Sequence, residues 1–224
     1  MIAVIDYGMG NLRSVQKALE VSGAKTKVTS SAKDLEKCEK LVFPGVGAFG
    51  AAMKELKRLK LAGPIREIIA EGKPFLGLCL GLQLLFDKSE EAPGVKGLGI
   101  LKGEVKRFAF TQYAIPACQQ SKFLQSGRRN TQYALKVPHM GWNCINKRSK
   151  IKNQILDGVP NGSYMYFVHS YYVKPKDKSI ILTTTDYGME FVSGVCRDNV
   201  YGLQFHPEKS QEMGLKILRN FVKL

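Results

Sequence analysis

The sequence predicts an α/β fold, with a mostly parallel central sheet flanked by helices and antiparallel strands added in the C-terminal half. Short apolar runs alternate with amphipathic helical segments as far as Phe86, which is the pattern of a parallel sheet covered by helices. After Phe86 the chain becomes strand-rich, with turn residues between the runs, and this favours antiparallel additions. The 224 residues, of which 44% are hydrophobic, are expected to form one domain over 1–224.

In the first half, the expected strands are the short apolar runs at 2–5, 26–29, 41–43 and 75–78. Helices are expected to span 51–59 and 65–70 and to begin near residues 12 and 31, and 80–86 is expected to be the start of another buried helix. Gly23 and Gly72 suit the position directly after a helix. The loop with Gly8 and Gly10 lacks the third glycine of a dinucleotide-binding fingerprint, so we expect it to shape the mouth of a site.

In the second half, strands are expected at 101–108, 163–168, 180–185, 191–196 and 200–205, and a helix at 211–224. The stretch 109–135 differs from both halves, because it is rich in Gln and basic residues, has no acidic residue and shows little periodicity. We expect it to be a basic surface insertion.

Composition excludes several classes of protein. No run approaches the roughly 20 apolar residues of a membrane span, and the first apolar run meets Asp6 at once, unlike a signal peptide, so a cytoplasmic protein is expected. The five cysteines are odd in number and form no Cys-x-x-Cys pair, so neither a disulfide framework nor a zinc site is expected. No metal or other cofactor is predicted.

The net charge of +15 would attract polyanions, acidic protein faces or phosphorylated ligands. Its densest cluster, residues 147–152, is expected to be a solvated face. Nucleic acid is not the expected partner, because the sequence contains no recognised nucleic-acid-binding module. Such binding would be revealed by steeply salt-dependent retention on DNA.

Cys79 stands between Gly77 and Gly81 at the junction of an expected strand and helix, in the Gly-x-Cys-x-Gly pattern of a nucleophile elbow. Glycines leave room for this sharp turn, and a helix N-terminus favours thiolate over thiol. The N–H of Leu80 would point at an oxyanion formed beside Cys79. The alternative is a buried core cysteine in a glycine-rich turn.

His206 and Glu208 supply a base and a group to orient it, two residues apart in a segment that Pro207 keeps from helix. An imidazole can take a thiol proton, and a carboxylate on its other nitrogen stabilises the imidazolium. The alternative is a surface turn. His139 and His169 are the other histidines, and neither has a carboxylate within a few residues, so structural or site-lining roles are expected for them.

Residues 44–47 form a Pro-Gly-Val-Gly loop directly after an expected strand, where free glycines let backbone N–H groups turn toward a ligand. A tight strand–helix turn is the alternative reading of this loop.

These motifs together resemble the class I glutamine amidotransferase family, which has a flavodoxin-like fold. The elbow at 77–81 with Gln83, and the His-Pro-Glu string at 206–208, carry this wider resemblance. Narrower strings resemble the glutaminase subunits of imidazole glycerol phosphate synthases, and they lie at 44–47, 138–143, 167–171 and 204–210. The likeness covers the whole chain except the basic insertion.

The resemblance implies that Cys79 attacks the side-chain amide of glutamine, that His206 moves the protons and that Glu208 orients His206. It implies an oxyanion hole formed by Gly47 and Leu80, and glutamine-contacting positions at Gly45, Val46, Gln83, Ser170 and Tyr171. Ammonia would pass to a (β/α)₈-barrel synthase subunit, forming a heterodimer that makes imidazole glycerol phosphate and an aminoimidazole carboxamide ribotide in histidine biosynthesis. Positions facing that partner would be Asn11, Trp142, Tyr166 and Lys209.

The insertion and the strong basicity depart from the family pattern. They leave open a paralogue that feeds ammonia to a related synthase, for example one forming an amidino group on a surface-polysaccharide sugar. A catalytically silent binding member of the fold is a further alternative, which the intact Cys79, His206 and Glu208 disfavour.

Overall fold

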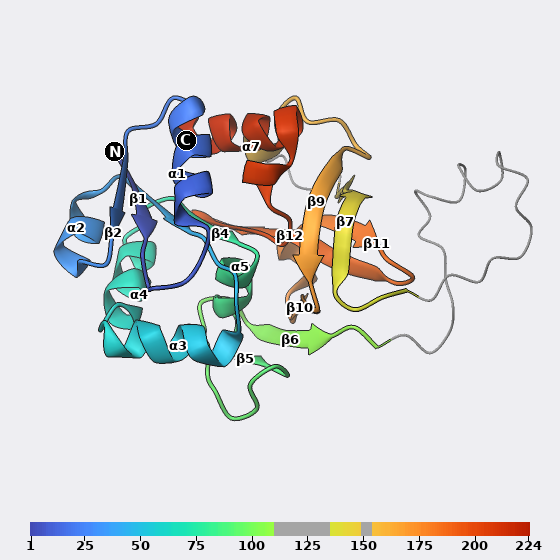
Figure 1. Cartoon of the computed structure of the whole chain (residues 1–224), viewed down its shortest axis with the longest axis horizontal. Helices are drawn as coiled ribbons and strands as arrows, with labels where there is room; N and C mark the ends of the chain where they lie inside the picture. Colours follow the sequence, from blue (N-terminus) through green and yellow to red (C-terminus); the bar gives the residue numbers. More distant parts are fainter. Residues whose placement is uncertain (110–134, 149–153) are drawn as a thin grey trace, which may run out of the picture.

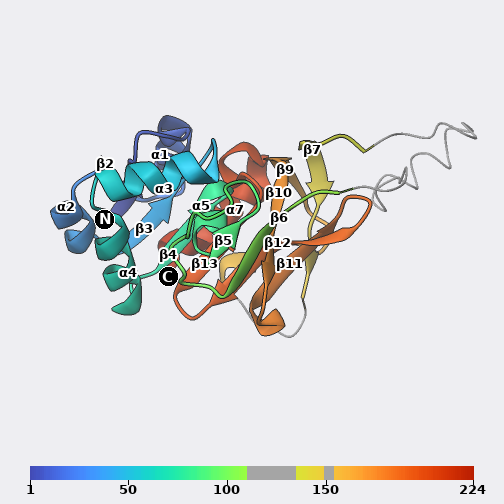
Figure 2. The same cartoon turned by 90° about the horizontal axis from the view of Figure 1, so that it is seen from below.

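The computed structural model describes residues 1–109, 135–148 and 154–224 (Figures 1 and 2). Its large sheet has the strand order β2-β1-β3-β4-β13-β12-β10-β6-β5, and β11 and β8 extend it from β12. The first five strands in this order are parallel: β2 (Thr26–Thr29), β1 (Ile2–Ile5), β3 (Lys40–Phe43), β4 (Phe75–Leu78) and β13 (Val200–Leu203). The parallel half of the predicted sheet is therefore confirmed.

Antiparallel strands complete the sheet, as the C-terminal half of the sequence predicts. They are β12 (Glu190–Arg197), β10 (Tyr171–Pro175), β6 (Gly103–Arg107), β11 (Ile181–Asp186) and β8 (Asn146–Lys147), while β5 (Lys88–Ser89) pairs parallel with β6. A separate antiparallel pair consists of β7 (His139–Cys144) and β9 (Tyr164–His169).

Helices cover both faces of the parallel half (Figure 1). One face carries α2 (Ala32–Lys37), α3 (Phe49–Arg58) and α4 (Ala62–Ala70), and the other carries α1 (Leu12–Val21) and α7 (Gln211–Lys223). α5 (Leu80–Leu84) follows β4, and single 3₁₀ turns lie at Gln154–Leu156, Lys178–Ile180 and Pro207–Lys209. No helix among the described residues is long and apolar enough to span a membrane.

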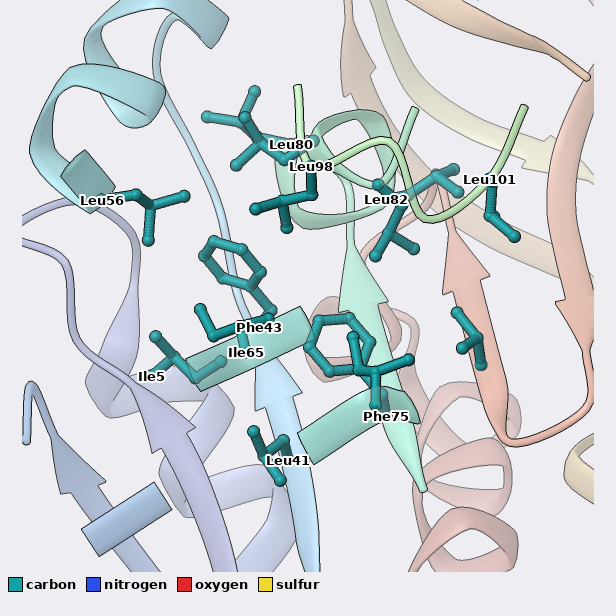
Figure 3. Packing of buried hydrophobic residues seen from close by; sticks show 14 of the residues in the cluster. Ile5, Leu41, Phe43, Leu56, Ile65, Phe75, Leu80, Leu82, Leu98 and Leu101 are labelled. Carbon is teal, nitrogen blue, oxygen red and sulfur yellow. The ribbon is translucent and has the colours of Figure 1, made fainter. Parts of the chain in front are cut away.

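Two apolar cores result, one on each face of the sheet. Ile5, Leu41 and Phe75 point into the core under α3 and α4 (Figure 3), whereas the alternate residues Val4 and Val42 point toward α1 and α7. Because both faces are covered, the central strands β1 and β4 are apolar throughout, and this is why they read clearly in the sequence.

Element boundaries differ from the sequence predictions by a few residues. The helix predicted at 51–59 begins at Phe49, whose N–H donates to the Glu91 carboxylate at 2.8 Å. The helix predicted at 65–70 begins at Ala62, and the helix predicted to start at 80–86 is short, since it ends at Leu84. The strand predicted at 200–205 ends at Leu203.

Strands β7 and β10 were not predicted from the sequence. On β7 the usual burial pattern is reversed, because His139 and Asn143 are buried while Met140 and Trp142 are exposed. An expectation that apolar residues mark the buried face therefore fails on this strand. Residues 110–134, which make up nearly all of the predicted basic insertion, lie outside the described residues.

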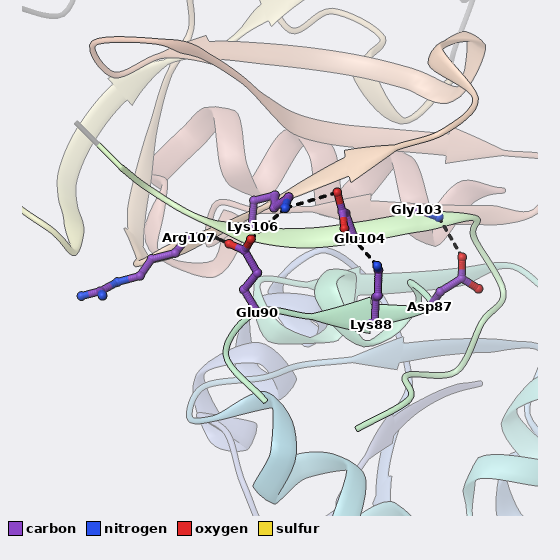
Figure 4. A network of polar contacts seen from close by, with 7 residues as sticks. All are labelled: Asp87, Lys88, Glu90, Gly103, Glu104, Lys106 and Arg107. Carbon is purple, nitrogen blue, oxygen red and sulfur yellow. Dashed lines mark hydrogen bonds and ion pairs between the residues drawn. The ribbon is translucent and has the colours of Figure 1, made fainter. Parts of the chain in front are cut away.

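The edge of the sheet at β5 and β6 is held by carboxylates (Figure 4). Asp87 accepts from the N–H of Gly103 at 2.9 Å, and Glu90 accepts from the N–H of Arg107 at 2.8 Å. Lys106 pairs with Glu90 at 2.7 Å. Side-chain acceptors thus satisfy backbone donors at the edge of the sheet, where unpaired groups would otherwise invite another chain to pair.

Candidate active site

Cys79 occupies a strained turn between β4 and α5. Its φ of 50° and ψ of −104° lie in a region of backbone conformation that residues other than glycine rarely adopt. The turn fits only because its flanking residues lack side chains: a Cβ at Gly77 would lie 2.7 Å from the Gly81 carbonyl oxygen, and one at Gly81 would collide with the Phe43 carbonyl oxygen. The geometry is that of a nucleophile elbow, as its sequence predicts.

His206 and Glu208 form a buried pair in the segment that follows β13. Nδ1 of His206 lies 2.8 Å from Oε1 of Glu208, and the two side chains are 3% and 1% exposed. The Nε2 atom is buried and makes no hydrogen bond of standard geometry with the described residues. Because Nδ1–H donates to the carboxylate, Nε2 is the nitrogen left for proton transfer.

Cys79 acts on His206 electrostatically, so the fold brings together the two groups that the sequence separates. Burial lowers the pKa of His206, but hydrogen bonding and charge from Cys79 and Glu208 outweigh it and raise that pKa to about 10. The imidazole is thus favoured as imidazolium at neutral pH. A thiolate beside an imidazolium is the activated form of a cysteine nucleophile.

Burial makes the other two histidines weak bases. Burial and the neighbouring His169 lower the pKa of His139 to about 3. Burial lowers the pKa of His169 to about 4, against a raising hydrogen bond to the Tyr171 carbonyl oxygen. Both ring nitrogens of His169 are engaged, by Tyr171 O at 2.7 Å and by Nδ1 of His139 at 3.0 Å. The sequence predicts structural or site-lining roles for these two histidines, and their contacts fit that prediction.

A cavity of about 280 Å³ opens beside the Cys79 sulfur. Its lining includes Val46, Gly47, Cys79, Leu80, Gln83, Ser170 and Tyr171, all of which the sequence placed at the site, and also Glu91, Pro138, Val168 and His169. Gly45 lies behind this surface, packed so closely that a Cβ there would be 2.7 Å from Leu80 Cβ and 2.9 Å from the Tyr7 hydroxyl.

The loop after β3 accepts a hydrogen bond from Leu80, one of the two predicted oxyanion donors. The N–H of Leu80 donates to the carbonyl oxygen of Gly45 at 3.4 Å, so it is not free for a ligand in this arrangement. Gly47 has a φ of 113°, which only glycine adopts readily. The Gly45 carbonyl must therefore turn away before Leu80 can donate to an oxyanion.

Comparison with known proteins agrees with this geometry. The model of the glutamine amidotransferase class-I family matches residues 3–224. The chain belongs to that family. Among similar proteins, "Imidazole glycerol phosphate synthase subunit HisH" of Aquifex aeolicus (strain VF5) is 50% identical over 219 residues, covering 97% of this chain and 94% of the relative.

A second relative has the same printed name. The HisH subunit of Pyrococcus furiosus (strain ATCC 43587 / DSM 3638 / JCM 8422 / Vc1) is 47% identical over 224 residues, covering 100% of this chain and 98% of the relative. Among solved structures, "Crystal structure of glutamine amidotransferase" matches with a TM-score of 0.71 at 17% identity, covering 100% of both chains. "Structure of PurLQS from Thermotoga maritima" matches with a TM-score of 0.70 at 19% identity, covering 99% of this chain and 97% of that chain. These structures support the fold alone.

Within the family fold, three of the four predicted interface residues gather at the β7–β9 pair. Trp142 and Tyr166 lie on paired positions of the two strands with ring centroids 6.0 Å apart, and Lys209 lies 5.7 Å from the Tyr166 ring centroid. Met140 and Tyr164 add exposed apolar surface there. Asn11 lies apart, directly before α1, in a loop where a Cβ added at Gly10 would lie 3.8 Å from the Pro44 carbonyl oxygen.

Sequence reasoning missed two residues that contact this site. Gln204 was quoted only as part of a motif, yet its amide Nε2 donates to the Cys79 sulfur at 3.5 Å. The Tyr7 hydroxyl is buried beside Gly45 without a hydrogen-bond partner among the described residues, and burial, then Cys79, raises its pKa. An uncharged polar residue beside an apolar run was the only available signal. Within the same described residues, no cluster of His, Cys, Asp and Glu is arranged to hold a metal.

Proposed function

We propose that this chain is the glutaminase subunit of an imidazole glycerol phosphate synthase in histidine biosynthesis. The observation that carries the proposal is the buried His206–Glu208 pair coupled to Cys79 beside a cavity. Family membership and the names of relatives at 47% and 50% identity support the same role. We place this biosynthetic reaction in the cytoplasm.

The proposed reaction begins with the Cys79 thiolate attacking the side-chain carbonyl carbon of glutamine, which forms a C–S bond and an oxyanion. His206, as imidazolium, donates its proton to the departing nitrogen, so the C–N bond breaks and ammonia leaves. Water then attacks the glutamyl thioester while His206 accepts its proton. The C–S bond breaks, and glutamate and the thiolate–imidazolium pair are produced. Glu208 keeps the imidazole in place throughout.

We propose that glutamine is held by the lining residues Val46, Gln83, Ser170 and Tyr171, with Gly45 setting the shape of the loop behind them. Leu80 and Gly47 would supply the oxyanion donors. The Leu80–Gly45 hydrogen bond supports a resting state that cannot stabilise the oxyanion. One such donor is worth about 10²–10³-fold in turnover, so a misdirected N–H suffices to keep the subunit off.

Docking of a (β/α)₈-barrel synthase subunit would turn the loop and switch the site on. We propose that this partner covers the exposed face of β7 and β9, with Trp142, Tyr166 and Lys209, and the loop of Asn11. Ammonia would pass directly to the partner. Measuring glutamine hydrolysis with and without the partner tests the switch, and equal rates would contradict it.

A decisive experiment measures glutamate formed from glutamine by the complex in the presence of the partner's aminoimidazole substrate, because the partner consumes the ammonia. Wild type is expected to form glutamate, and Cys79→Ala is expected to form none. Activity that persists in Cys79→Ala would refute the proposed nucleophile, and an inactive wild type would favour a silent member of the fold. A copurifying partner that ignores this substrate would favour the paralogue that feeds a different acceptor.

A further inference from the structure

Gln204 is a buried amide that the glutaminase mechanism above does not use. It follows β13 directly, is fully buried, and its backbone N–H donates to the Ser193 carbonyl oxygen at 2.9 Å. Its side-chain Nε2 lies 3.5 Å from the Cys79 sulfur, within hydrogen-bonding range for sulfur. A buried polar side chain therefore faces the reacting atom.

Neighbouring groups fix which end of this amide faces the sulfur. The Tyr171 carbonyl oxygen can only accept, so the Gln83 group that meets it at 3.1 Å is the NH₂ group. The same Nε2 of Gln83 lies 3.2 Å from Oε1 of Gln204, so Oε1 is the accepting end. The NH₂ group of Gln204 is consequently directed at Cys79. A flipped amide would place two donors together at Gln83 and an acceptor at the sulfur.

We propose that Gln204 is a catalytic residue that stabilises the Cys79 thiolate by donating a hydrogen bond to it. The inference rests on the proposed function and deepens it at the same site. The thiol donates toward the Val168 carbonyl oxygen at 3.9 Å, and once the proton has left, that oxygen faces a negative sulfur. A fixed N–H on the sulfur offsets this repulsion.

The donor raises the fraction of Cys79 that is thiolate and lowers the intrinsic nucleophilicity of that thiolate. The thiolate is the form that attacks, and a fixed donor raises the fraction of cysteine in that form wherever some thiol remains. A tenfold rise in the thiolate fraction costs about threefold in intrinsic nucleophilicity, because the Brønsted coefficient is about 0.4–0.5. The net effect near neutral pH is faster attack, whereas at high pH, where all cysteine is thiolate, the gain disappears.

The test is alkylation of Cys79 by iodoacetamide in the full chain, followed by mass spectrometry of the peptide that contains Cys79. Gln204→Met keeps the length of the side chain and removes the donor. We expect alkylation about threefold slower or more than in wild type at about pH 7, and equal or faster at about pH 10. Ser193→Ala is the matched control, because it removes a buried hydroxyl on the adjacent strand without touching the sulfur, and its rates should equal those of wild type.

Gln204→Glu provides a second variant should the Met protein fold poorly. It retains an oxygen for Gln83 and places a carboxylate near the sulfur, so alkylation at about pH 7 should fall at least as far. Wild-type rates in both variants at that pH would overturn the proposal. A deficit of the same size at both pH values would also overturn it, since that pattern reports altered access. Neither result would bear on glutamine hydrolysis itself, which the Cys79→Ala experiment tests separately.

Discussion

Acidification should destabilise this fold through the buried histidine pair before the carboxylates protonate. His139 has a pKa of about 3 in the folded protein, against its ordinary value of 6.5. Between these values the unfolded chain binds a proton that the folded chain does not, so the free energy of unfolding falls as pH falls. At about pH 5, roughly 1.5 units below the ordinary value, the loss from His139 alone is about 2 kcal/mol.

Replacing His139 isolates this contribution. His139→Gln removes the titrating group, so the difference in unfolding free energy between wild type and variant should shrink by about 2 kcal/mol between about pH 7 and pH 5. Contributions from all other groups, including the Cys79–His206 pair, largely cancel in this difference. Urea unfolding at a series of pH values measures it.

Phe167→Leu is the matched control, because Phe167 stacks on His139 with ring centroids 4.9 Å apart and does not titrate. The loss of unfolding free energy caused by Phe167→Leu should be the same at every pH between about 5 and 7. The reasoning is refuted if the His139→Gln difference is equally independent of pH, since His139 would then be as easily protonated in the folded chain as in the unfolded one.

Three further predictions concern the elbow, the triad and a loop anchor. Gly81→Ala forces a Cβ onto the Phe43 carbonyl oxygen. It should lower the free energy of unfolding in urea by at least about 1–3 kcal/mol and abolish glutamine hydrolysis. Gly63→Ala places a Cβ in open space and should change neither quantity. Glu208→Gln removes a cause of the raised pKa of His206 and should lower kcat by about 10²–10⁴-fold in steady-state assays of the complex, with KM for glutamine little changed. Asn199→Ala removes hydrogen bonds to the carbonyl oxygens of Ile69 and Lys73 at 2.9 and 2.7 Å and should cost about 1–3 kcal/mol in the same unfolding experiment; no loss would mean that water replaces the amide.

The central parallel strands could be predicted because burial on both faces leaves a continuous apolar run. β1 and β4 are buried at every residue, and their boundaries match the prediction. β7 could not be predicted, since its buried residues His139 and Asn143 are polar and satisfied by contacts from distant strands. A sequence pattern reports the polarity of a side chain and not the partners that make its burial tolerable.

Some features of the candidate site could likewise be predicted from the sequence, and others could not. His206 and Glu208 could be named because their residue types carry chemistry at a short spacing, and Cys79 could be named because its flanking glycines mark a nucleophile elbow. The state of the oxyanion loop could not, because the Leu80–Gly45 hydrogen bond depends on how two loops approach each other. The contact of Gln204 with the Cys79 sulfur could not be predicted for a related reason. The Gln204 amide donates to the sulfur only because the Gln83 amide fixes its orientation.

Strand register explains why these distant residues must meet. β4 and β13 are parallel neighbours in which Leu78 pairs with Leu203, and the N–H of Cys79 donates to the Leu203 carbonyl oxygen at 2.7 Å. The residues that follow each strand, Cys79 and Gln204, therefore leave the sheet side by side, and His206 comes two positions later. A shift of two residues in that register would move the partners by about 7 Å, which is too far for either proton transfer or a hydrogen bond to sulfur. The positions of nucleophile, donor and base are thus consequences of one strand pairing, which the apolar residues of β4 and β13 hold in place by filling both cores.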